Sequence, residues 1–195
     1  MTFNMNIIDS VSRYIGPFRT VGENTVIFSI EDFLNRQYYS GGASRVIKRK
    51  IVEQFGYLNQ DCQTEDSVFN FRAFLTTGLG YCSIPMVNYR VHDNNISSPT
   101  NLLVGFDPKL IYKQYKKDLD IAQKNGIINK CKYDLILRHL VHHRDKEEAI
   151  RKIYIKKMLV SRLAIYFPMI FSNKYSLRTK LSFLKTILSW KINKF

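Results

Sequence analysis

The charge of this 195-residue chain is divided sharply between its two halves. Residues 1–100 contain nine Lys and Arg residues and nine Asp and Glu residues, whereas residues 101–195 contain 21 basic and seven acidic residues. The whole net charge of +14 therefore belongs to the second half. The boundary falls at a Ser-Ser-Pro-Thr-Asn run, whose composition is typical of a loop. We expect an α/β part over residues 1–100 and a basic, α-helical C-terminal extension over residues 101–195.

The composition indicates a packed domain in a reducing compartment. Hydrophobic residues make up 45% of the chain, with 13 Phe and 12 Tyr against nine Gly and five Pro, which favours a core over a low-complexity linker. Three widely spaced cysteines are interpreted as reduced thiols of a cytosolic protein, and residues 1–12 lack the pattern of a secretory signal. The apolar stretch Met158 to Phe171 is shorter than the ~20 residues of a bilayer-spanning helix. We therefore expect no transmembrane helix.

Turn and capping signals predict the elements near the N-terminus. Short strands are expected at Asn6–Val11 and Thr25–Phe28, with a turn at Gly16-Pro17 between them. The sequence Ser29-Ile30-Glu31-Asp32 is typical of a capping box, in which Ser29 accepts a backbone N–H. It predicts a helix that continues to about Tyr38.

The next segment predicts a short amphipathic helix. Ser44 is placed to cap it, and Ile47, Ile51 and Phe55 recur at helical spacing along one face. Gly56 is expected to end it.

A third helix and a strand are expected to follow. The helix begins at Thr64 and ends at Gly78, and the strand covers Tyr81–Tyr89. Pro85 within this strand indicates a sheet edge or a strand start, because proline cannot donate a hydrogen bond to a neighbouring strand.

The second half is predicted to be helical throughout. Asp107-Pro108 is typical of a helix start and Gly126 of a helix end. Further helices are expected at Lys132–Arg144, Lys146–Phe167 and Lys174–Lys191.

Thr64-Glu65-Asp66 places two carboxylates at the start of a helix, where free backbone N–H groups favour the ionised form. An ionised carboxylate can act as a general base. Acids in a first turn also have a purely structural role, because they complement the helix dipole. Glu31-Asp32 is such a case, since the capping box explains it without catalysis. Spacing alone leaves both interpretations of Asp66 open.

The order of several motifs is more specific than any one of them. The series consists of a turn at Gly41-Gly42-Ala43-Ser44, a basic amphipathic helix, Thr64-Glu65-Asp66 followed by Arg72 and Gly78, and finally Tyr89-Arg90-Val91-His92. This order resembles the acceptor half of a family 2 glycosyltransferase of the GT-A fold. The resemblance covers residues 6–101 and implies a partial GT-A-like, Rossmann-like mixed sheet with helices.

The resemblance also implies roles for the matched residues. Asp66 would be the general base that deprotonates the acceptor hydroxyl, while Gly41, Gly42, Glu65 and Arg90 would bind substrate. Arg90 is expected to pair either with a phosphate or with Asp66. Taken alone, the two glycines would indicate only a turn.

His92 would complete the coordination of a divalent ion, Mn²⁺ or Mg²⁺, at the donor diphosphate. Imidazole is a common ligand for such metals. The structural alternative is a loop histidine bonded to Asp93 or to a backbone carbonyl. Asn95 and Ser97 are expected to fix the conformation of the same loop.

One motif of the family is missing from its expected place. The Asp-x-Asp that holds metal and diphosphate should precede these motifs, but the only such sequence is Asp118-Leu119-Asp120. Its carboxylates point to different faces of a helix, so we interpret it as a solvated surface pair. We therefore expect an acceptor-side portion that lacks the nucleotide-binding half, and its activity in isolation stays open.

A histidine cluster at His139, His142 and His143 invites a zinc-site hypothesis, because the first and last are four residues apart on one helical face. The sequence offers neither the Glu of His-Glu-x-x-His nor a nearby third ligand. Surface histidines are the favoured interpretation.

The last 45 residues contain eleven Lys or Arg residues and no acid, interleaved with aromatic residues. The stripe Leu177, Leu181, Leu184 and Leu188 suits either a helix lying on an anionic membrane or a helix packed on the domain. Each basic residue near an anionic leaflet contributes ~1 kcal/mol. Nucleic acid is a less favoured partner, because no recognisable reading element is present.

Together these features predict an inverting, metal-dependent glycosyltransferase. It would transfer a sugar from a nucleotide-sugar donor to a lipid-linked saccharide acceptor during synthesis of a cell-surface polysaccharide of the O-antigen or capsule type. It is expected in the cytoplasm, peripheral on the inner face of the plasma membrane. The alternative is an inactive remnant or an accessory membrane-binding protein that does not bind donor.

Overall fold

A computed structural model describes residues 1–19, 25–38, 40, 42–92, 95, 105–156, 169, 180 and 181. Within these residues the chain forms a four-stranded mixed sheet and five helices, which confirms the α/β class. The expected helix at Lys174–Lys191 and the leucine stripe lie outside the described residues, apart from the isolated positions Lys180 and Leu181. None of the helices in the described part combines the length and the apolar content needed to cross a bilayer.

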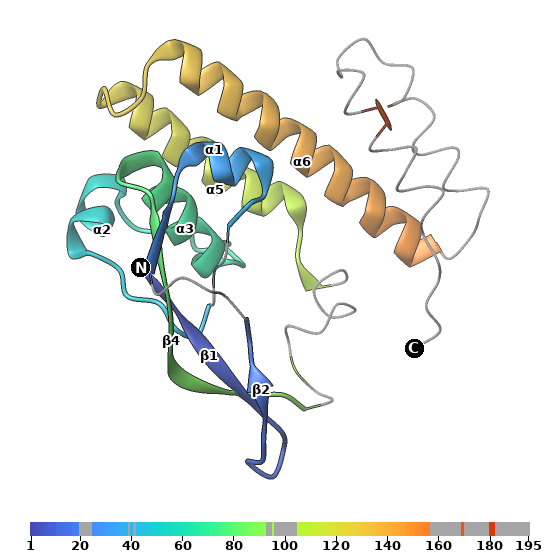
Figure 1. Cartoon of the computed structure of the whole chain (residues 1–195). Helices are drawn as coiled ribbons and strands as arrows, with labels where there is room; N and C mark the ends of the chain where they lie inside the picture. Colours follow the sequence, from blue (N-terminus) through green and yellow to red (C-terminus); the bar gives the residue numbers. More distant parts are fainter. Residues whose placement is uncertain are drawn as a thin grey trace.

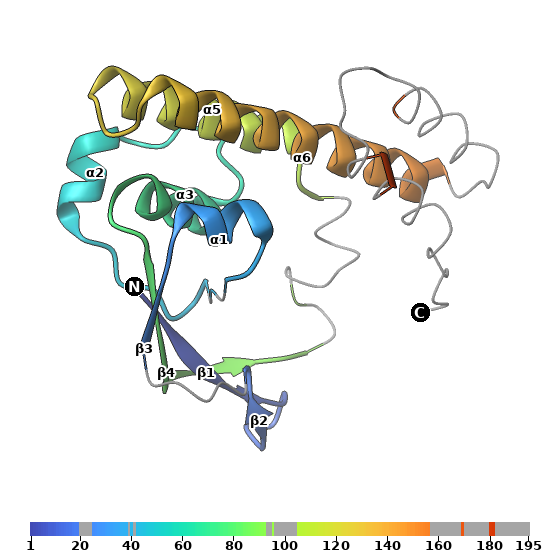
Figure 2. The same ribbon diagram turned by 45° about the horizontal axis from the view of Figure 1, so that its top comes forward.

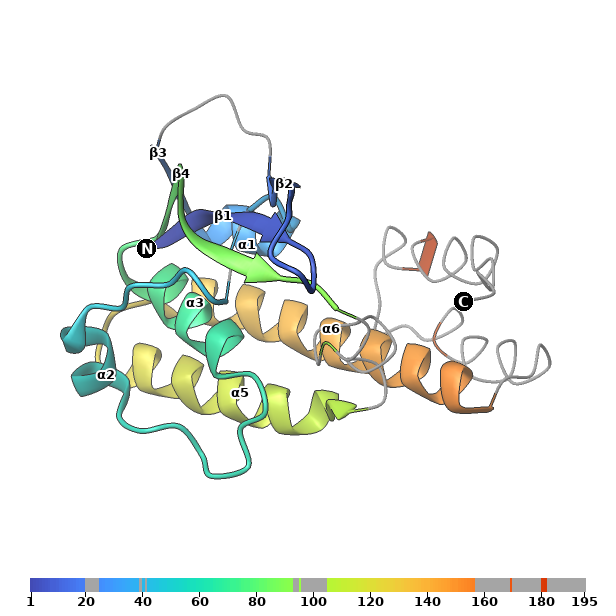
Figure 3. The ribbon, with the colours of Figure 1, turned by 90° about the horizontal axis from the view of Figure 1, so that it is seen from below.

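The sheet has the strand order β2-β1-β4-β3. Its strands are β1 (Thr2–Ile8), β2 (Tyr14–Pro17), β3 (Thr25–Phe28) and β4 (Leu79–Arg90). β1 and β4 run parallel in the centre, and the outer strands are antiparallel to them. Figure 3 shows β1 beside β4, with β2 next to only the C-terminal end of β1.

The turn predicted at Gly16-Pro17 is wrong, because these residues belong to β2 and pair with β1. The chain reverses earlier, at Asp9–Arg13. Oδ1 of Asp9 accepts hydrogen bonds from the backbone N–H of Val11 (2.9 Å) and of Arg13 (2.8 Å). This side-chain turn brings Tyr14 back alongside β1.

Pro85 predicted a sheet edge or a strand start. β4 as a whole is a central strand, but Pro85 lies beyond the part of β4 that pairs with β3. Two irregularities let the proline fit. The register against β1 shifts around Asn4, which lies opposite Pro85, and β3 pairs only with Leu79–Cys82. The missing N–H of Pro85 therefore interrupts no regular ladder.

The capping box of helix α1 (Ile30–Asn35) is confirmed. Ser29 Oγ accepts from the N–H of Asp32 at 3.3 Å, and Asp32 Oδ2 accepts from the N–H of Ser29 at 2.6 Å. The helix ends before the predicted Tyr38, because Arg36 adopts a left-handed conformation.

Helix α2 (Arg49–Phe55) ends at Gly56 as predicted, but Ser44 does not cap it. The Ser44 hydroxyl instead donates to the carbonyl of Phe3. Residues 44–46 extend along the first part of β1, where the N–H of Phe3 donates to Ser44 O at 3.0 Å. Because the backbone of Ser44 is bonded to the start of β1, helix α2 begins only at Arg49.

Helix α3 (Glu65–Thr76) starts where the sequence predicts, and the chain leaves it through Gly78. Gly78 has φ of 88°, and a Cβ at this position would lie 2.7 Å from the carbonyl oxygen of Phe28. Only glycine satisfies both conditions.

Helix α5 (Pro108–Lys124) has the predicted Asp107 cap, which accepts from the N–H of Lys109 at 2.9 Å. Helix α6 (Lys130–Lys156) is continuous, so the break predicted near Asp145 is wrong. The residues around Asp145 are good helix formers. Ion pairs one turn apart also support the helix there: Oε1 of Glu148 lies 3.9 Å from Nε of Arg144, and Oε2 lies 3.8 Å from Nζ of Lys152.

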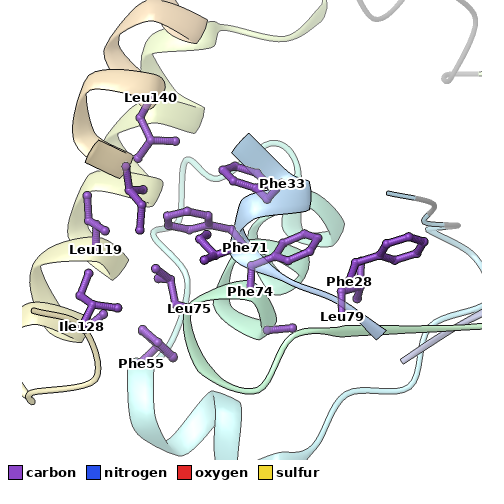
Figure 4. Packing of buried hydrophobic residues seen from close by; sticks show 14 of the residues in the cluster. Phe28, Phe33, Phe55, Phe71, Phe74, Leu75, Leu79, Leu119, Ile128 and Leu140 are labelled. Atoms are coloured by element: carbon purple, nitrogen blue, oxygen red, sulfur yellow. The ribbon is translucent and has the colours of Figure 1, made fainter. Parts of the chain in front are cut away.

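The elements form three layers (Figures 1 and 2). The sheet is covered by α1, α2 and α3, and the antiparallel pair α5 and α6 lies over these helices. The core crosses the boundary predicted near residue 100. Figure 4 shows three aromatic rings between leucines of the helical pair and residues of the sheet: Phe33, Phe71 and Phe74 between Leu119 and Leu140 on one side and Phe28 and Leu79 on the other.

A buried ion pair joins α3 to α5 inside this core. Arg72 and Asp118 are both fully buried, with Nε 2.7 Å and Nη2 3.0 Å from the two carboxylate oxygens. The interpretation of Asp118 as a surface acid is wrong, while Asp120 is half-exposed and bonded to Lys116. Burial raises the pKa of Asp118, and its hydrogen bonds with Arg72 and Gln114 oppose that rise.

Removing the charge of Asp118 should destabilise the protein far more than removing that of Asp120. Asp118→Asn leaves the buried guanidinium of Arg72 without its counterion, which is expected to lower the free energy of unfolding by about 3–5 kcal/mol. Asp120→Asn, two residues away and half-exposed, should change it by less than about 1 kcal/mol. Urea unfolding followed by circular dichroism measures both, and equal effects would contradict the structural role of the pair.

Candidate functional site

Asp66 lies in the first turn of α3 with its carboxylate partly open to solvent. Its side chain is 42% exposed. Oδ1 accepts from the N–H of Ser67 at 2.8 Å, whereas Oδ2 faces away from the helix toward the turn that contains Gly42. Oδ1 is thus held by the helix, and Oδ2 is turned toward Gly42 and Arg45.

Gly42 lies directly against Oδ2 of Asp66. A Cβ at Gly42 would be 2.5 Å from Oδ2 of Asp66, which is shorter than any normal contact. A side chain at this position would therefore require the carboxylate of Asp66 to move. The structure brings together two residues that the sequence assigned separately to substrate binding and to catalysis.

Backbone pairing with β1 holds this turn in place. Thr2 forms a bridge with Arg45, and the N–H of Val46 donates to the carbonyl of Met1 at 2.8 Å. The position of Gly42 is therefore set by the sheet, while that of Asp66 is set by α3.

Arg45 is a member of this site that the sequence did not single out. Its side chain is 8% exposed, and Nη2 lies 4.0 Å from Oδ2 of Asp66. Nε donates to Oδ1 of Asn70 at 3.1 Å, one turn beyond Asp66 on α3. Burial lowers the pKa of Arg45, and Asp66 and Glu65 oppose this. Asp66 and Asn70 are four residues apart on one face of α3, which is a sequence signal that they share a partner. The spacing does not identify that partner as Arg45, which is distant in sequence.

Two half-buried tyrosines interact with each other, and one of them, Tyr115, also with Asp66; the sequence did not identify them either. Burial raises the pKa of Tyr115 well above its usual range, with the Tyr38 hydroxyl and the Asp66 carboxylate adding to the rise and Ser67 opposing it. Burial likewise raises the pKa of Tyr38, whose ring meets Phe74 edge-on at 5.0 Å. Both phenols are neutral at physiological pH and present no competing charge to Asp66.

Arg90 is fastened to the β1–β2 turn. Nη1 donates to the carbonyls of Asp9 and Ser10 at 3.0 Å each, and Nη2 donates to the hydroxyl of Ser12 at 3.1 Å. The ion pair of Asp66 in the described residues is with Arg45, so the expected pairing of Arg90 with Asp66 is wrong.

The backbone N–H of His92 donates to Oδ1 of Asn95 at 2.9 Å, and Nδ2 of Asn95 donates to the carbonyl of Arg90 at 3.2 Å. Asn95 thus fixes this loop as expected. Gly41, Asp93 and Ser97 lie outside the described residues, and Glu65 is exposed next to Asp66.

The described residues contain no group of three or more His, Cys, Asp or Glu that could hold a metal ion. His92 therefore belongs to no such group in that part of the chain. His139, His142 and His143 do not form such a group there either.

The histidines of α6 are half-buried instead of lying on the surface. The ring of His139 is 5.5 Å from that of Phe33 and 6.4 Å from that of His143. Burial, followed by the charge of Arg36, lowers the pKa of His139 to about 4 and that of His143 to about 3. Both imidazoles are neutral packing groups at pH 7.

Comparison with protein-family models, curated proteins and solved structures finds no match to this chain.

The histidines should make the protein less stable in mild acid. The unfolded chain binds protons at His139 and His143 near pH 6.5, whereas the folded chain takes them up only near pH 4 and pH 3. The stabilisation is complete above pH 6.5 and is lost as the pH falls. Urea unfolding at a series of pH values should show this slope. In a His139→Gln/His143→Gln variant, the free energy of unfolding should depend less on pH at pH values above those at which carboxylates titrate. An unchanged pH dependence would contradict the lowered pKa values of these two histidines.

Proposed function

We propose that this chain is the acceptor-side portion of a family 2, GT-A-like glycosyltransferase, with Asp66 as general base. The contact between Gly42 and Oδ2 of Asp66 carries the proposal. The two residues belong to motifs that are separated in sequence. Their meeting supports a common site, because the helix-dipole interpretation of Asp66 requires no glycine beside the carboxylate.

The fold is compatible with this assignment at a coarse level. A mixed α/β sheet with helices on it is the architecture the resemblance implies. The helix that carries Asp66 leads through Gly78 directly into the central strand β4. The specifically GT-A-like arrangement belongs to the proposal.

The proposed reaction uses Asp66 as a proton acceptor. As the acceptor hydroxyl oxygen attacks the anomeric carbon of the donor, its proton passes to Oδ2 of Asp66. A new bond forms between this oxygen and the anomeric carbon, and the bond from that carbon to the nucleoside diphosphate breaks with its electron pair. Attack from the opposite face inverts the configuration.

Arg45 would position the base. Its guanidinium is held by Asn70 and lies 4.0 Å from the carboxylate, where its positive charge attracts Oδ2 and limits the directions it can take. Because Gly42 has no side chain, Oδ2 can lie close to this turn without being displaced.

The resemblance implies a divalent ion, Mn²⁺ or Mg²⁺, which would neutralise the charge on the leaving diphosphate. The described residues do not supply a complete ligand set. No step above passes through the metal, and the chain's own contribution is the acceptor side of the reaction.

The proposed acceptor is a lipid-linked saccharide at the inner face of the plasma membrane. Its support is the run of eleven basic residues without an acid in the last 45 positions, which favours an anionic bilayer. An accessory protein that binds the membrane without binding donor remains the competing proposal, because the same charge serves it equally.

In an assembly that transfers sugar, Asp66→Asn should abolish transfer and leave folding intact. Removing a general base costs at least about 100-fold in rate, while the carboxamide can still accept from Ser67. The assay supplies lipid-linked saccharide in membrane vesicles, a panel of nucleotide sugars and Mn²⁺, and measures release of nucleoside diphosphate. Wild-type turnover retained by the variant would remove Asp66 from the reaction.

Gly42→Ala should reduce turnover strongly, because the new Cβ displaces the carboxylate of Asp66. Gly16→Ala is the matched control, since a Cβ at Gly16 meets nothing within 4 Å. If the wild-type chain releases no nucleoside diphosphate and shows no Mn²⁺-dependent binding of any nucleotide sugar, the accessory interpretation takes precedence.

Retention on vesicles separates the membrane from nucleic acid as the partner. The chain should bind vesicles containing anionic phospholipid in a salt-dependent manner and should bind duplex DNA more weakly at the same ionic strength. Preferential binding to DNA would overturn the proposed membrane partner.

A further inference from the structure

A pocket of about 200 Å³ lies between the first half of α5 and the later turns of α6. The two helices run side by side (Figure 1), and Thr64 at the start of α3 also lines the pocket. Cζ of Arg144 lies 4.6 Å from the ring centre of Tyr112, which joins the two helices along one wall. The apolar residues that line the pocket are Phe106, Pro108, Ile111, Tyr112, Tyr115 and Leu140.

Part of this apolar surface is not used by the core. Phe106 and Ile111 are half-buried and lie outside the described core cluster. Tyr115 packs against that cluster, with its ring centre 4.7 Å from that of Phe71, and lines the pocket as well. An apolar ligand is favoured in such a pocket, because binding removes apolar surface from water.

The charged residues at the pocket are balanced by groups of opposite sign. Nη2 of Arg144 lies 2.6 Å from Oδ1 of Asp145, and Nη1 of Arg151 lies 3.8 Å from Oδ2 of Asp107. Glu147 adds a further carboxylate to the lining. The described lining therefore presents no excess of positive charge to an anion, and the apolar wall determines which class of ligand fits.

Thr64 has a buried hydroxyl group that lacks a partner. A threonine just before a helix normally accepts from the N–H of the second or third helical residue. Here Ser67, the third residue of α3, donates its N–H to Oδ1 of Asp66 at 2.8 Å. Oγ1 of Thr64 has no hydrogen-bond partner in the described part of the chain. Such a group is costly to bury, and a polar atom on a bound ligand would satisfy it.

The pocket extends from the neighbourhood of the proposed general base along α6. Thr64 is two residues before Asp66, and the hydroxyl of Tyr115 is bonded to Ser67 and influenced by the charge of Asp66. On α6 the lining runs from Leu140 to Arg151, which is about 16 Å of helix. The run of basic residues without an acid, for which a membrane partner is proposed, begins at Arg151.

We propose that this pocket holds an aliphatic chain, which in the proposed transferase is the part of the acceptor lipid nearest to its saccharide. The identification of the chain as an acceptor lipid rests on the proposed function, whereas the apolar pocket does not. An apolar cavity of about 150 Å³ holds benzene. A pocket of about 200 Å³ therefore suits roughly eight carbon atoms.

Calorimetric titration of the full chain with n-alkanols of increasing length tests the pocket. From butanol to octanol, each added methylene group should tighten binding about fourfold, because each is buried on binding. The affinity should then level off, since the pocket is full at roughly eight carbon atoms. A continued rise to dodecanol would indicate an open apolar surface and contradict the pocket, and no binding of octanol would overturn the proposal.

Phe106→Ser should weaken octanol binding at least about fivefold, because it removes an apolar wall of the pocket. Tyr57→Ser is the matched control, since Tyr57 is 87% exposed and is not a lining residue. It should leave octanol binding unchanged.

Ile111→Trp should block octanol binding by filling the pocket. Leu135→Trp is its control, because Leu135 is 48% exposed on α6 and does not line the pocket. Circular dichroism checks that each variant folds. Octanol binding that is insensitive to both Phe106→Ser and Ile111→Trp would overturn the proposed pocket.

The acceptor assignment is tested in an assembly that transfers sugar. Ile111→Trp should raise the KM for the lipid-linked acceptor at least about fivefold more than the KM for the same saccharide without its lipid. Equal effects on the two KM values would overturn the assignment of the chain to the acceptor. If no assembly transfers sugar, the proposed function fails, and the alkanol series still decides whether the pocket binds an aliphatic chain.

Discussion

The buried pair of Arg72 and Asp118 is the interaction on which the arrangement of the helices depends. Each group is fully buried, so each would be severely destabilising without the other. The pair also organises its surroundings: Arg72 Nη1 donates to the carbonyl of Gly56 at 2.9 Å, and Gln114 donates to Asp118 at 2.9 Å while accepting from the N–H of Asn59 at 2.8 Å. This network joins α3, α5 and the chain that leaves α2. Because Asp66 lies in the first turn of α3, its direction is set by the same network.

The candidate site results from two independent constraints that meet at one carboxylate. Pairing with β1 fixes the turn containing Gly42 and Arg45, and the core fixes α3. Neither constraint alone places the carboxylate next to the glycine. A site built on a strand-paired segment and a well-packed helix is held more rigidly than one built on loops, which is what a positioned proton acceptor requires.

Features determined by neighbours in sequence were predictable, and those determined by distant partners were not. The cap formed by Ser29 with Asp32, the start at Asp107-Pro108 and the ends at Gly56 and Gly78 all depend on a few adjacent residues, and the structure confirms them. Ser44 failed as a cap because β1, far away in sequence, takes its hydroxyl. Asp118 failed as a surface acid because Arg72 draws it into the core. The same limit applies to the site, where Asp66 and Gly42 were identified from motifs but Arg45, Asn70 and Tyr115 became visible only through tertiary contacts.

Four arginines show how the degree of charge pairing separates structural from ligand-facing roles. Arg72 has a full carboxylate partner and no solvent exposure, so its role is completed within the core. Arg90 satisfies its donors on the carbonyls and hydroxyl of one turn, so it holds the sheet's outer strand. Arg45 donates to Asn70 and lies 4.0 Å from Asp66, so it can position the carboxylate that we propose as the general base. The backbone N–H of Arg36 is bonded to carbonyls of α1, and its left-handed backbone position favours glycine, so this arginine serves first as the end of the helix. A ligand-facing role in this molecule is therefore best supported where the fold leaves a charge loosely paired and partly exposed, as at Asp66.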